Sequence, residues 1–445
     1  MPRIFAVLFQ KAPLMHVFRS LSTFLLALLI SWLPRPSMGQ VSSDCINEVT
    51  GQPCGKELNT ITTAVPFLMI SPDSRAGGMG DAGVAISADA NAIHWNPAKL
   101  AFAPHDGEFK ISYSPWLRNL VPDMNLAYLA GYGRLKNKRS TVGGALRYFN
   151  LGSIQFTDQN GNAIREFKPA EFAIDVAFGQ QFSDVFSGGL AVRYVNSNLT
   201  GGLNVTGADT KAGQTVAADV SFFYQKQDMK LGDKEGIFAF GLNISNIGAK
   251  MSYSTTAKRD FIPANLRIGP CFTYIMDKYN KLSIHFDANK LLVPTPPIYE
   301  KDSAGQYVVD QATGEYVVAS GKDPNVGVAA GIIQSFSDAP GWFDQNGNLV
   351  SGSKTKEELR EINLGGGIEY WYADQFAARA GYFWEHYTKG NRQYFTVGLG
   401  LRYNIFAIDV SYLIANTQRS PLANTLRFTL GFNFDTGKKK KDEVE

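Results

Sequence analysis

The sequence predicts an all-β protein, a transmembrane antiparallel β-barrel of about 14 strands with an N-terminal plug inside it. Three observations support this prediction. Apolar and polar residues alternate in many short segments between residues 107 and 434. The connections between these segments are alternately short and long, and a glycine-rich polar stretch at residues 70–102 precedes them. Strands that face lipid on one side and a polar interior on the other have this alternation.

Residues 1–39 have the features of a signal peptide. They contain four basic residues and no acidic residue, an apolar run at residues 21–33, and small residues just before position 40. The apolar run is shorter than the about 20 residues that a membrane helix needs. We therefore expect cleavage near Gly39. The mature chain then holds 39 basic and 40 acidic residues, a balance that argues against nucleic acid as a partner.

Residues 40–66 are predicted to form a periplasmic N-terminal segment. Cys45 and Cys54 lie close together in it, and we expect them to form a disulfide because disulfides persist in exported proteins. Metal binding by this pair is the weaker alternative, since no histidine is nearby. Cys271 stands alone within an expected strand and is interpreted as a small buried residue.

The glycine-rich stretch is predicted to form a hatch at residues 67–105. Its glycines permit tight turns and close approach of other backbone, and Pro97 favours an extended residue before it. An ordinary N-terminal loop domain is the alternative interpretation. The expected hatch residues are Pro72, Arg75, Gly78, Gly80, Asp81, Asn96 and Pro97.

The barrel is predicted to span residues 106–434. Its last strand is the clearest, because Leu426, Phe428 and Leu430 share one face while Arg427 and Thr429 share the other. A soluble sandwich would also alternate, and the connections separate the two possibilities. The expected strands lie near residues 107–114, 125–135, 140–149, 170–182, 187–196, 213–226, 236–247, 264–276, 282–290, 361–372, 376–385, 394–404, 405–413 and 424–434.

Short turns on one side and long loops on the other are the asymmetry of an outer-membrane barrel. We therefore expect a multi-pass protein of the outer membrane with long extracellular loops, the longest at residues 291–360. An even number of strands places both termini on the periplasmic side, where residues 435–445 form a charged tail.

Charged residues of both signs are expected to point into the lumen. We interpret them as filling and stiffening the barrel, with a conducting pathway as the alternative. By alternation they are Arg147, Arg193, Arg267, Arg379, Arg402, Arg427, Asp175, Glu369 and Glu385.

Several motifs of the hatch and of the longest loop carry a family resemblance. They are PFL at residues 66–68, SPDSRAG at 71–77, GDA at 80–82, HWNPAK at 94–99, NKLLVPTPP at 289–297 and QSFSDAPG at 334–341. The hatch motifs resemble those of FadL-type outer-membrane proteins, which are plugged barrels of fourteen strands. Together with the loop motifs, the chain is similar to the PorV family, FadL-like proteins of the Bacteroidetes type IX secretion system.

The resemblance implies a role in handling proteins. Members of this family are described as shuttles that bind cargo through its C-terminal signal domain at a giant translocon barrel of the SprA/Sov type. They deliver the cargo to the sortase-like PorU attachment complex at the cell surface. Outer-membrane lipid or lipopolysaccharide is a further expected partner. A FadL-like channel for hydrophobic small molecules is the alternative function, and Gly365, Gly366 and Gly367 could kink one strand into a lateral opening.

The loop at residues 291–360 is the expected partner-binding region. Its proline-rich run is preset as an extended segment, so little entropy is lost on docking, and aromatic residues suit an interface anchor. A lid that packs these aromatics inward is the alternative, and the two interpretations are compatible within one loop. The candidate residues are Val293, Pro294, Thr295, Pro296, Pro297, Trp342 and Phe343, with Trp116 and Leu117 in the first long loop.

No enzymatic activity is expected. The chain has no nucleophile-elbow motif, and His285 shares a strand face with Asp287 without an identifiable nucleophile. No clustered Cys and His residues suggest a metal, and no cofactor is predicted. A role in lipid A modification is not decided by the sequence.

Overall fold

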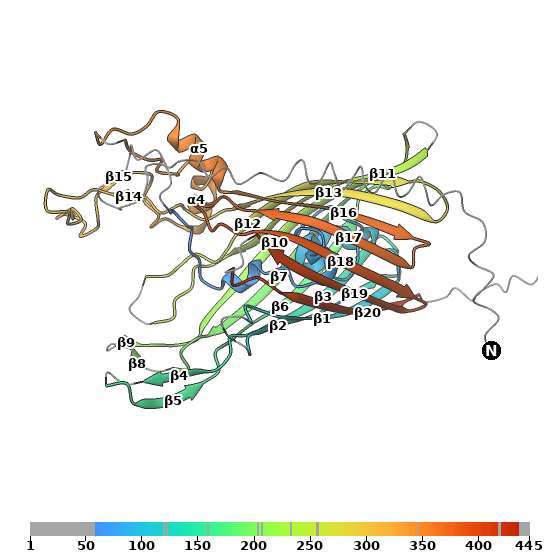
Figure 1. Cartoon of the computed structure of the whole chain (residues 1–445), viewed down its shortest axis with the longest axis horizontal. Helices are drawn as coiled ribbons and strands as arrows, with labels where there is room; N and C mark the ends of the chain where they lie inside the picture. The colour runs from blue at the N-terminus through green and yellow to red at the C-terminus, as the bar shows by residue number, and fades with distance from the viewer. Residues whose placement is uncertain are drawn as a thin grey trace, which may run out of the picture.

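Fourteen antiparallel strands close into a barrel in the computed structural model (Figure 1). The structure describes residues 58–435, apart from 119–120, 122, 158–159, 203, 206–207, 232–233, 255–257, 345 and 417–419. The predicted signal peptide, Cys45, Cys54 and the tail after residue 435 therefore lie outside the described residues. The barrel strands are β1 (Gly107–Pro115), β2 (Asn125–Arg134), β3 (Ser140–Asn150), β6 (Ala170–Gln181), β7 (Phe186–Asn198), β10 (Gly213–Leu231), β11 (Lys234–Gly248), β12 (Asn265–Ile275), β13 (Asn280–Leu291), β16 (Ile362–Tyr372), β17 (Phe376–Trp384), β18 (Gln393–Tyr403), β19 (Phe406–Ala415) and β20 (Leu426–Phe434).

The predicted fold class is confirmed. Each strand pairs with its neighbours in chain order, and β20 closes the barrel against β1 in the register Ile111 opposite Leu430. Register shifts interrupt the pairing of β10 with β11 between Ala218 and Val220 and between Lys226 and Met229.

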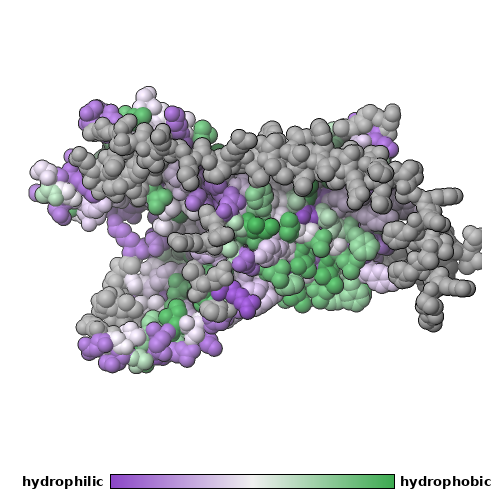
Figure 2. All heavy atoms as spheres, in the orientation of Figure 1, coloured by the Kyte–Doolittle hydropathy of each residue, from purple (hydrophilic) through white to green (hydrophobic). Residues whose placement is uncertain are grey.

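The outer wall of the barrel is apolar. Side chains such as Val176, Leu190, Val192 and Leu399 alternate with buried residues and are more than half exposed. Figure 2 shows a hydrophobic band on the barrel wall and more hydrophilic residues over the long connections. Such a band is what contact with the hydrocarbon core of a bilayer requires.

The long connections carry structure of their own. They contain the strand pairs β4 (Ile154–Thr157) with β5 (Ala163–Phe167), β8 (Asn204–Val205) with β9 (Ala208–Asp209), and β14 (Ile298–Tyr299) with β15 (Val318–Ser320). The longest connection also holds α4 (Val328–Gln334) and α5 (Ser353–Arg360). Among the helices in the described part of the chain, none is long and apolar enough to cross a membrane.

The glycine-rich segment lies inside the barrel. It forms η1 (Pro66–Met69), α2 (Ser74–Gly77), α3 (Ala92–Trp95) and η2 (Pro97–Phe102), and nearly all of these residues are buried. Its hydrogen bonds reach strands all around the lumen. Gly80 donates to Thr396 of β18 and Gly83 donates to Asp287 of β13, while Asn96 donates to the carbonyl of Phe222 in β10. We call residues 64–103 the hatch.

Glycines of the wall allow the hatch backbone to pack directly against the strands. A Cβ atom on Gly381 would lie 2.2 Å from the backbone nitrogen of Gly80, and one on Gly365 would lie 2.5 Å from its carbonyl oxygen. These glycines provide close approach, and no kink accompanies them. β16 pairs with both neighbours without a register shift, so the strand shows no lateral opening at Gly365–Gly367.

The chain enters the hatch from the long-loop end. The amide of Asn59 donates to the carbonyl of Thr388, and that of Ala64 donates to the carbonyl of Phe261, both in long connections. The start of β1 lies at the opposite end of the barrel, where the amide of Asp106 donates to the carboxylate of Asp435. The prediction that residues 40–66 share a side with the C-terminal end is therefore wrong for residues 58–64. An even number of strands places the start of β1 and the end of β20 at the same end of the barrel. It does not determine at which end the segment before β1 begins.

Candidate partner-binding surface at the long-loop end

The longest connection leaves β13 at Leu291 and returns to β16 at Ile362. Its first residues, 292–297, run from the barrel rim beneath the rest of the connection. Val293 is 2% exposed and Thr295 is fully buried. The proline-rich run is therefore a buried support, as in the lid alternative, and it does not present these side chains freely to solvent.

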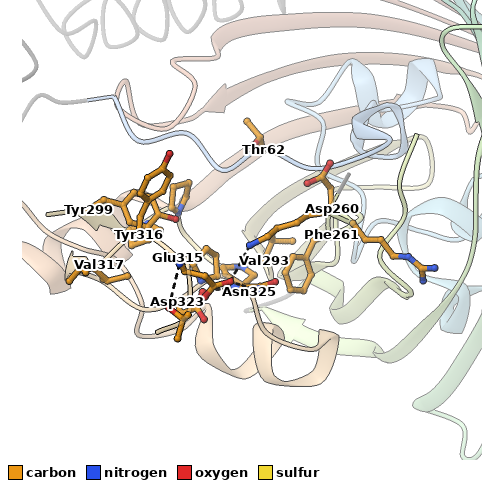
Figure 3. Close-up of a pocket in the computed structure, with 18 of the residues that line it drawn as sticks. Thr62, Asp260, Phe261, Val293, Tyr299, Glu315, Tyr316, Val317, Asp323 and Asn325 are labelled. Carbon is orange, nitrogen blue, oxygen red and sulfur yellow. Dashed lines mark hydrogen bonds and ion pairs between the residues drawn. The ribbon is translucent and has the colours of Figure 1, made fainter. Parts of the chain in front are cut away.

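A cavity of about 790 Å³ lies between this run and two other segments of the long-loop end (Figure 3). Thr62 of the N-terminal segment, Phe261 of the β11–β12 connection and Val293 lie on its walls. Pro294, Pro296 and Pro297 contribute further wall residues. The expected partner-binding residues that line the cavity thus all belong to the proline-rich run.

Tyrosines and charges shape the outer part of the cavity. Tyr299 stands edge-on to Tyr316 with ring centroids 5.5 Å apart, and Tyr307 packs against both rings. Lys258 and Glu315 form an ion pair of 3.1 Å, and Asn325 donates to the same carboxylate. Acidic and basic groups both line the cavity, namely Lys250, Lys258, Arg259, Asp260, Asp310, Glu315 and Asp323.

The connection also exposes large apolar side chains. Ile333 at the end of α4 is 75% exposed, Leu359 of α5 is 62% exposed, and Phe336 is 52% exposed. The sequence interpretation missed these three residues. The QSFSDAPG motif contains Phe336, but the pattern of the short α4 gave no indication of which face would be solvent-exposed.

The expected aromatic anchors are partly buried. Trp342 packs beneath the guanidinium of Arg360 at 4.5 Å, and Phe343 is half-buried. Trp116 packs against the apolar cluster around Phe67 and Leu68 of the hatch, and Leu117 beside it is half-buried. The structure therefore does not bring the two expected aromatic groups together as one open surface.

A buried polar cluster holds the connection together. Glu361 accepts from Lys290 at 2.6 Å, from Thr295 Oγ1 at 2.7 Å and from Lys389 at 3.1 Å. The amide of Thr295 donates to Asp338 at 3.1 Å. Burial raises the pKa of Asp338 to about 6, the bond from Thr295 opposes this rise, and the negative charge of Glu361 adds to it.

The expected hatch residues all lie inside the barrel. Arg75 forms two hydrogen bonds with Glu369 of β16, at 2.9 and 2.7 Å. Asp81 accepts from Arg427 of β20 and from the hydroxyl of Tyr394 of β18, both at 2.6 Å. Pro72, Gly78, Asn96 and Pro97 are buried, and Gly80 adopts a positive φ of 71°.

The expected lumen charges face the interior, and they have partners there. Arg193 bridges Asp175 at 2.5 Å and Asp219 at 3.2 Å, and Arg379 bridges Glu369 and Asp409, each at 2.7 Å. The others contact the hatch, a wall residue or a long connection. They are Arg147 with the carbonyl of Leu68, Arg267 with Asn289 and Trp95, Arg402 over Trp371, Arg427 with Asp81, and Glu385 with Arg392.

His285 and Asp287 contact the backbone of the hatch. His285 Nε2 lies 3.3 Å from the carbonyl of Met79, and Asp287 accepts from the amides of Gly83 and Val84. This arrangement uses the pair as docking points for hatch backbone. Cys271 is buried and free.

Comparisons with known proteins identify a family. The model of "Type IX secretion system protein PorV" matches residues 54–298, more than half of the chain. None of the curated proteins matches. Among solved structures, the chain is similar to the Pseudomonas putida toluene transporter TodX, with 11% identity and a TM-score of 0.45 over 82% of this chain and 99% of that chain. It is also similar to a Pseudomonas aeruginosa FadL homologue, with 11% identity and a TM-score of 0.38 over 85% and 100% of the two chains.

Proposed function

This chain belongs to the PorV family of type IX secretion system proteins, and from that membership we propose that it is a non-enzymatic cargo adaptor of the outer membrane. It binds secreted proteins through their C-terminal signal domains at a giant translocon barrel of the SprA/Sov type. It then delivers them to the sortase-like PorU attachment complex on the cell surface. The role in type IX secretion follows from the family membership. The capture of cargo and its delivery are what we propose beyond that role.

One observation supports an adaptor over a conduit: the lumen is occupied, and the apolar binding features lie at the long-loop end. The hatch bonds to strands around the whole lumen, for example from Gly80 to Thr396 and from Asn96 to Phe222. In contrast, Ile333, Phe336 and Leu359 project from the longest connection with more than half of their surfaces exposed. Exposed apolar side chains beside a polar rim are characteristic of protein interaction sites.

The cavity at the long-loop end suits an extended protein segment. Its volume of about 790 Å³ exceeds that of a single side chain, and prolines and tyrosines make much of its wall. Rigid aromatic and proline surfaces lose little entropy when a partner docks. Charges of both signs at Lys258 and Glu315 offer polar contacts for backbone or side chains of the cargo.

The test is affinity purification of the tagged protein from native membranes in mild detergent, followed by mass spectrometry. The wild type should recover secreted proteins that share a C-terminal domain, together with a very large barrel or a sortase-like protease. Ile333→Glu should reduce this recovery about tenfold, as expected for loss of an interface anchor. Ile164→Glu is the matched control, since Ile164 is 58% exposed in the β4–β5 pair of another long connection.

Two results would contradict the proposal. Equal recovery with Ile333→Glu and Ile164→Glu would remove the longest connection from the interface. Recovery of the barrel alone, with co-purifying fatty acids or other hydrophobic molecules, would instead favour a FadL-like channel for hydrophobic small molecules.

A further inference from the structure

We infer that the longest connection contains a calcium site formed by Asp338, Glu358 and Glu361. Each of these carboxylates offers an oxygen atom, and the three oxygens all lie within 4.8 Å of one another. Ca²⁺ binds oxygen ligands at about 2.4 Å, so ligands of one ion lie at most about 4.8 Å apart. The three residues come from the turn after α4, from α5 and from the rim of β16, so the site forms only when the connection is folded.

One carboxylate oxygen of this group is buried without a hydrogen-bond partner among the described residues. Asp338 is 1% exposed, and its Oδ2 accepts from the amide of Thr295. Its Oδ1 is buried and has no hydrogen-bond partner among the described residues. A buried acceptor without a partner costs about 1–3 kcal/mol, and more when it is charged. A bound cation would supply the missing partner.

The charge of the cluster leads to the same inference. Four carboxylates meet here, Glu357 being the fourth, and two ammonium groups balance them in part. Lys290 lies 2.6 Å from Glu361 and 3.3 Å from Glu358, and Lys389 lies 2.8 Å from Glu357 and 3.1 Å from Glu361. Among these six groups, the carboxylates carry two more charges than the ammonium groups when all of them are ionised. A divalent cation matches that surplus.

Lys290 is the competitor for the site. Its ammonium contacts two of the three proposed ligands and also lies 5.9 Å from the centre of the Phe336 ring. Cation–π contact gives the ammonium a favourable second position. Calcium binding would therefore weaken the bonds of Lys290 to Glu358 and Glu361, so Lys290 lowers the affinity of the site.

Bound calcium would fasten three parts of the connection to one another. Asp338 already accepts from the amide of Thr295, and Glu361 accepts from its hydroxyl. The ion would thus join α5, the turn after α4 and the proline run beneath the cavity. The irregular ligand set, drawn from separate segments, suits the flexible coordination of Ca²⁺ better than the octahedral demand of Mg²⁺.

The experiment is calorimetric titration of CaCl₂ into the purified, chelator-treated protein in detergent, with MgCl₂ as the second arm. We expect one site with a dissociation constant of about 10⁻⁴–10⁻³ M, the range of extracellular calcium modules, and weaker binding of Mg²⁺. Hydrogen exchange at residues 338–361 should slow on addition of calcium. No partner protein is needed, so failure here is distinct from failure of the proposed adaptor role.

Three variants make the result specific. Asp338→Asn should weaken calcium binding about tenfold, because it removes the charge of the unpartnered ligand. Lys290→Met should tighten binding, because it removes the competing cation. Glu300→Gln removes a carboxylate that is exposed on the same connection and should leave the affinity unchanged. Absence of calcium binding in both the wild type and Lys290→Met would overturn the inference, and so would equal affinity of the wild type and Asp338→Asn.

Discussion

Arg75 of the hatch and Glu369 of β16 form a two-point ion pair inside the barrel, with bonds of 2.9 and 2.7 Å. The same carboxylate also accepts from Arg379 of β17, and Arg75 reaches Asp89 at 3.2 Å. Hatch and wall therefore share one continuous ionic network. Because Glu369 has 4% of its side chain exposed, this network is shielded from water.

Loss of either partner of this pair should destabilise the protein strongly. Arg75→Met leaves the carboxylate of Glu369 with one guanidinium in place of two, and breaking a buried pair costs about 3–5 kcal/mol. Glu369→Gln should act similarly. Thermal unfolding in detergent measures the effect. The matched control is Lys281→Met, which breaks an exposed pair of 2.7 Å with Asp374 and should cost about 0–1 kcal/mol. Equal shifts for Arg75→Met and Lys281→Met would show that the buried network adds no stability.

Gly381→Ala should displace the hatch. Its new methyl group would lie 2.2 Å from backbone atoms of Met79 and Gly80, which cannot move aside as a flexible side chain would. We expect higher conductance in planar bilayers and greater sensitivity of cells to large antibiotics. Gly133→Ala is the control, because a Cβ atom there meets nothing within 4 Å. Unchanged conductance with Gly381→Ala would mean that the hatch tolerates this displacement without opening the lumen.

Filling the cavity should reduce cargo capture without unfolding the barrel. Thr313 lines the cavity and is exposed, so Thr313→Trp adds a large ring where the cargo segment is proposed to dock. Recovery of cargo should fall about tenfold, as for loss of an interface anchor. Ala312→Trp places the same ring on the neighbouring residue, which does not line the cavity. If both variants recover cargo like the wild type, the cavity is not part of the binding surface.

The connection between β17 and β18 should loosen as the pH falls. Burial lowers the pKa of His386, and the nearby charges of Arg360 and Lys389 act in the same direction. Well above pH 6.5 the imidazole is neutral in both the folded and the unfolded connection. Below that pH the unfolded form takes up a proton more readily, so the folded form loses stability. Hydrogen exchange at residues 385–392 should therefore speed up between pH 7.5 and 5.5, and less so in His386→Gln. The same acceleration in His386→Gln would assign the effect to other groups.

Alternation identified the strands well because it follows directly from lipid on one side and a polar lumen on the other. The predicted strand at residues 424–434 is observed at Leu426–Phe434, and inward charges such as Arg379 and Arg427 are buried. The partners of those charges required the register as well. Arg379 meets Glu369 because they stand opposite each other in the pairing of β16 with β17, whereas Arg75 and Glu369 are 294 residues apart.

The long connections were harder to interpret from sequence. A proline-rich run indicates an extended backbone and does not reveal what packs over it, so Thr295 was expected at an interface and is fully buried. The connection also contains α5 (Ser353–Arg360), and the exposure of its Leu359 depends on how that helix lies on the rim. Hydrogen bonds from Thr295 to Asp338 and to Glu361 join distant parts of the connection, and no periodic pattern in the sequence predicts them.

The path of residues 58–106 constrains the order of assembly. Asn59 is bonded to the rim at one mouth of the barrel and Asp106 to the other, so this segment runs the full length of the lumen. If β20 paired with β1 first, the chain before Ala64 would have to be threaded through a finished ring, and folded chains avoid threading. The wall must therefore close around a segment already laid along its axis. A force applied at the β1 mouth would then have to break the anchorage of Asn59 at the far mouth before it could extract the hatch.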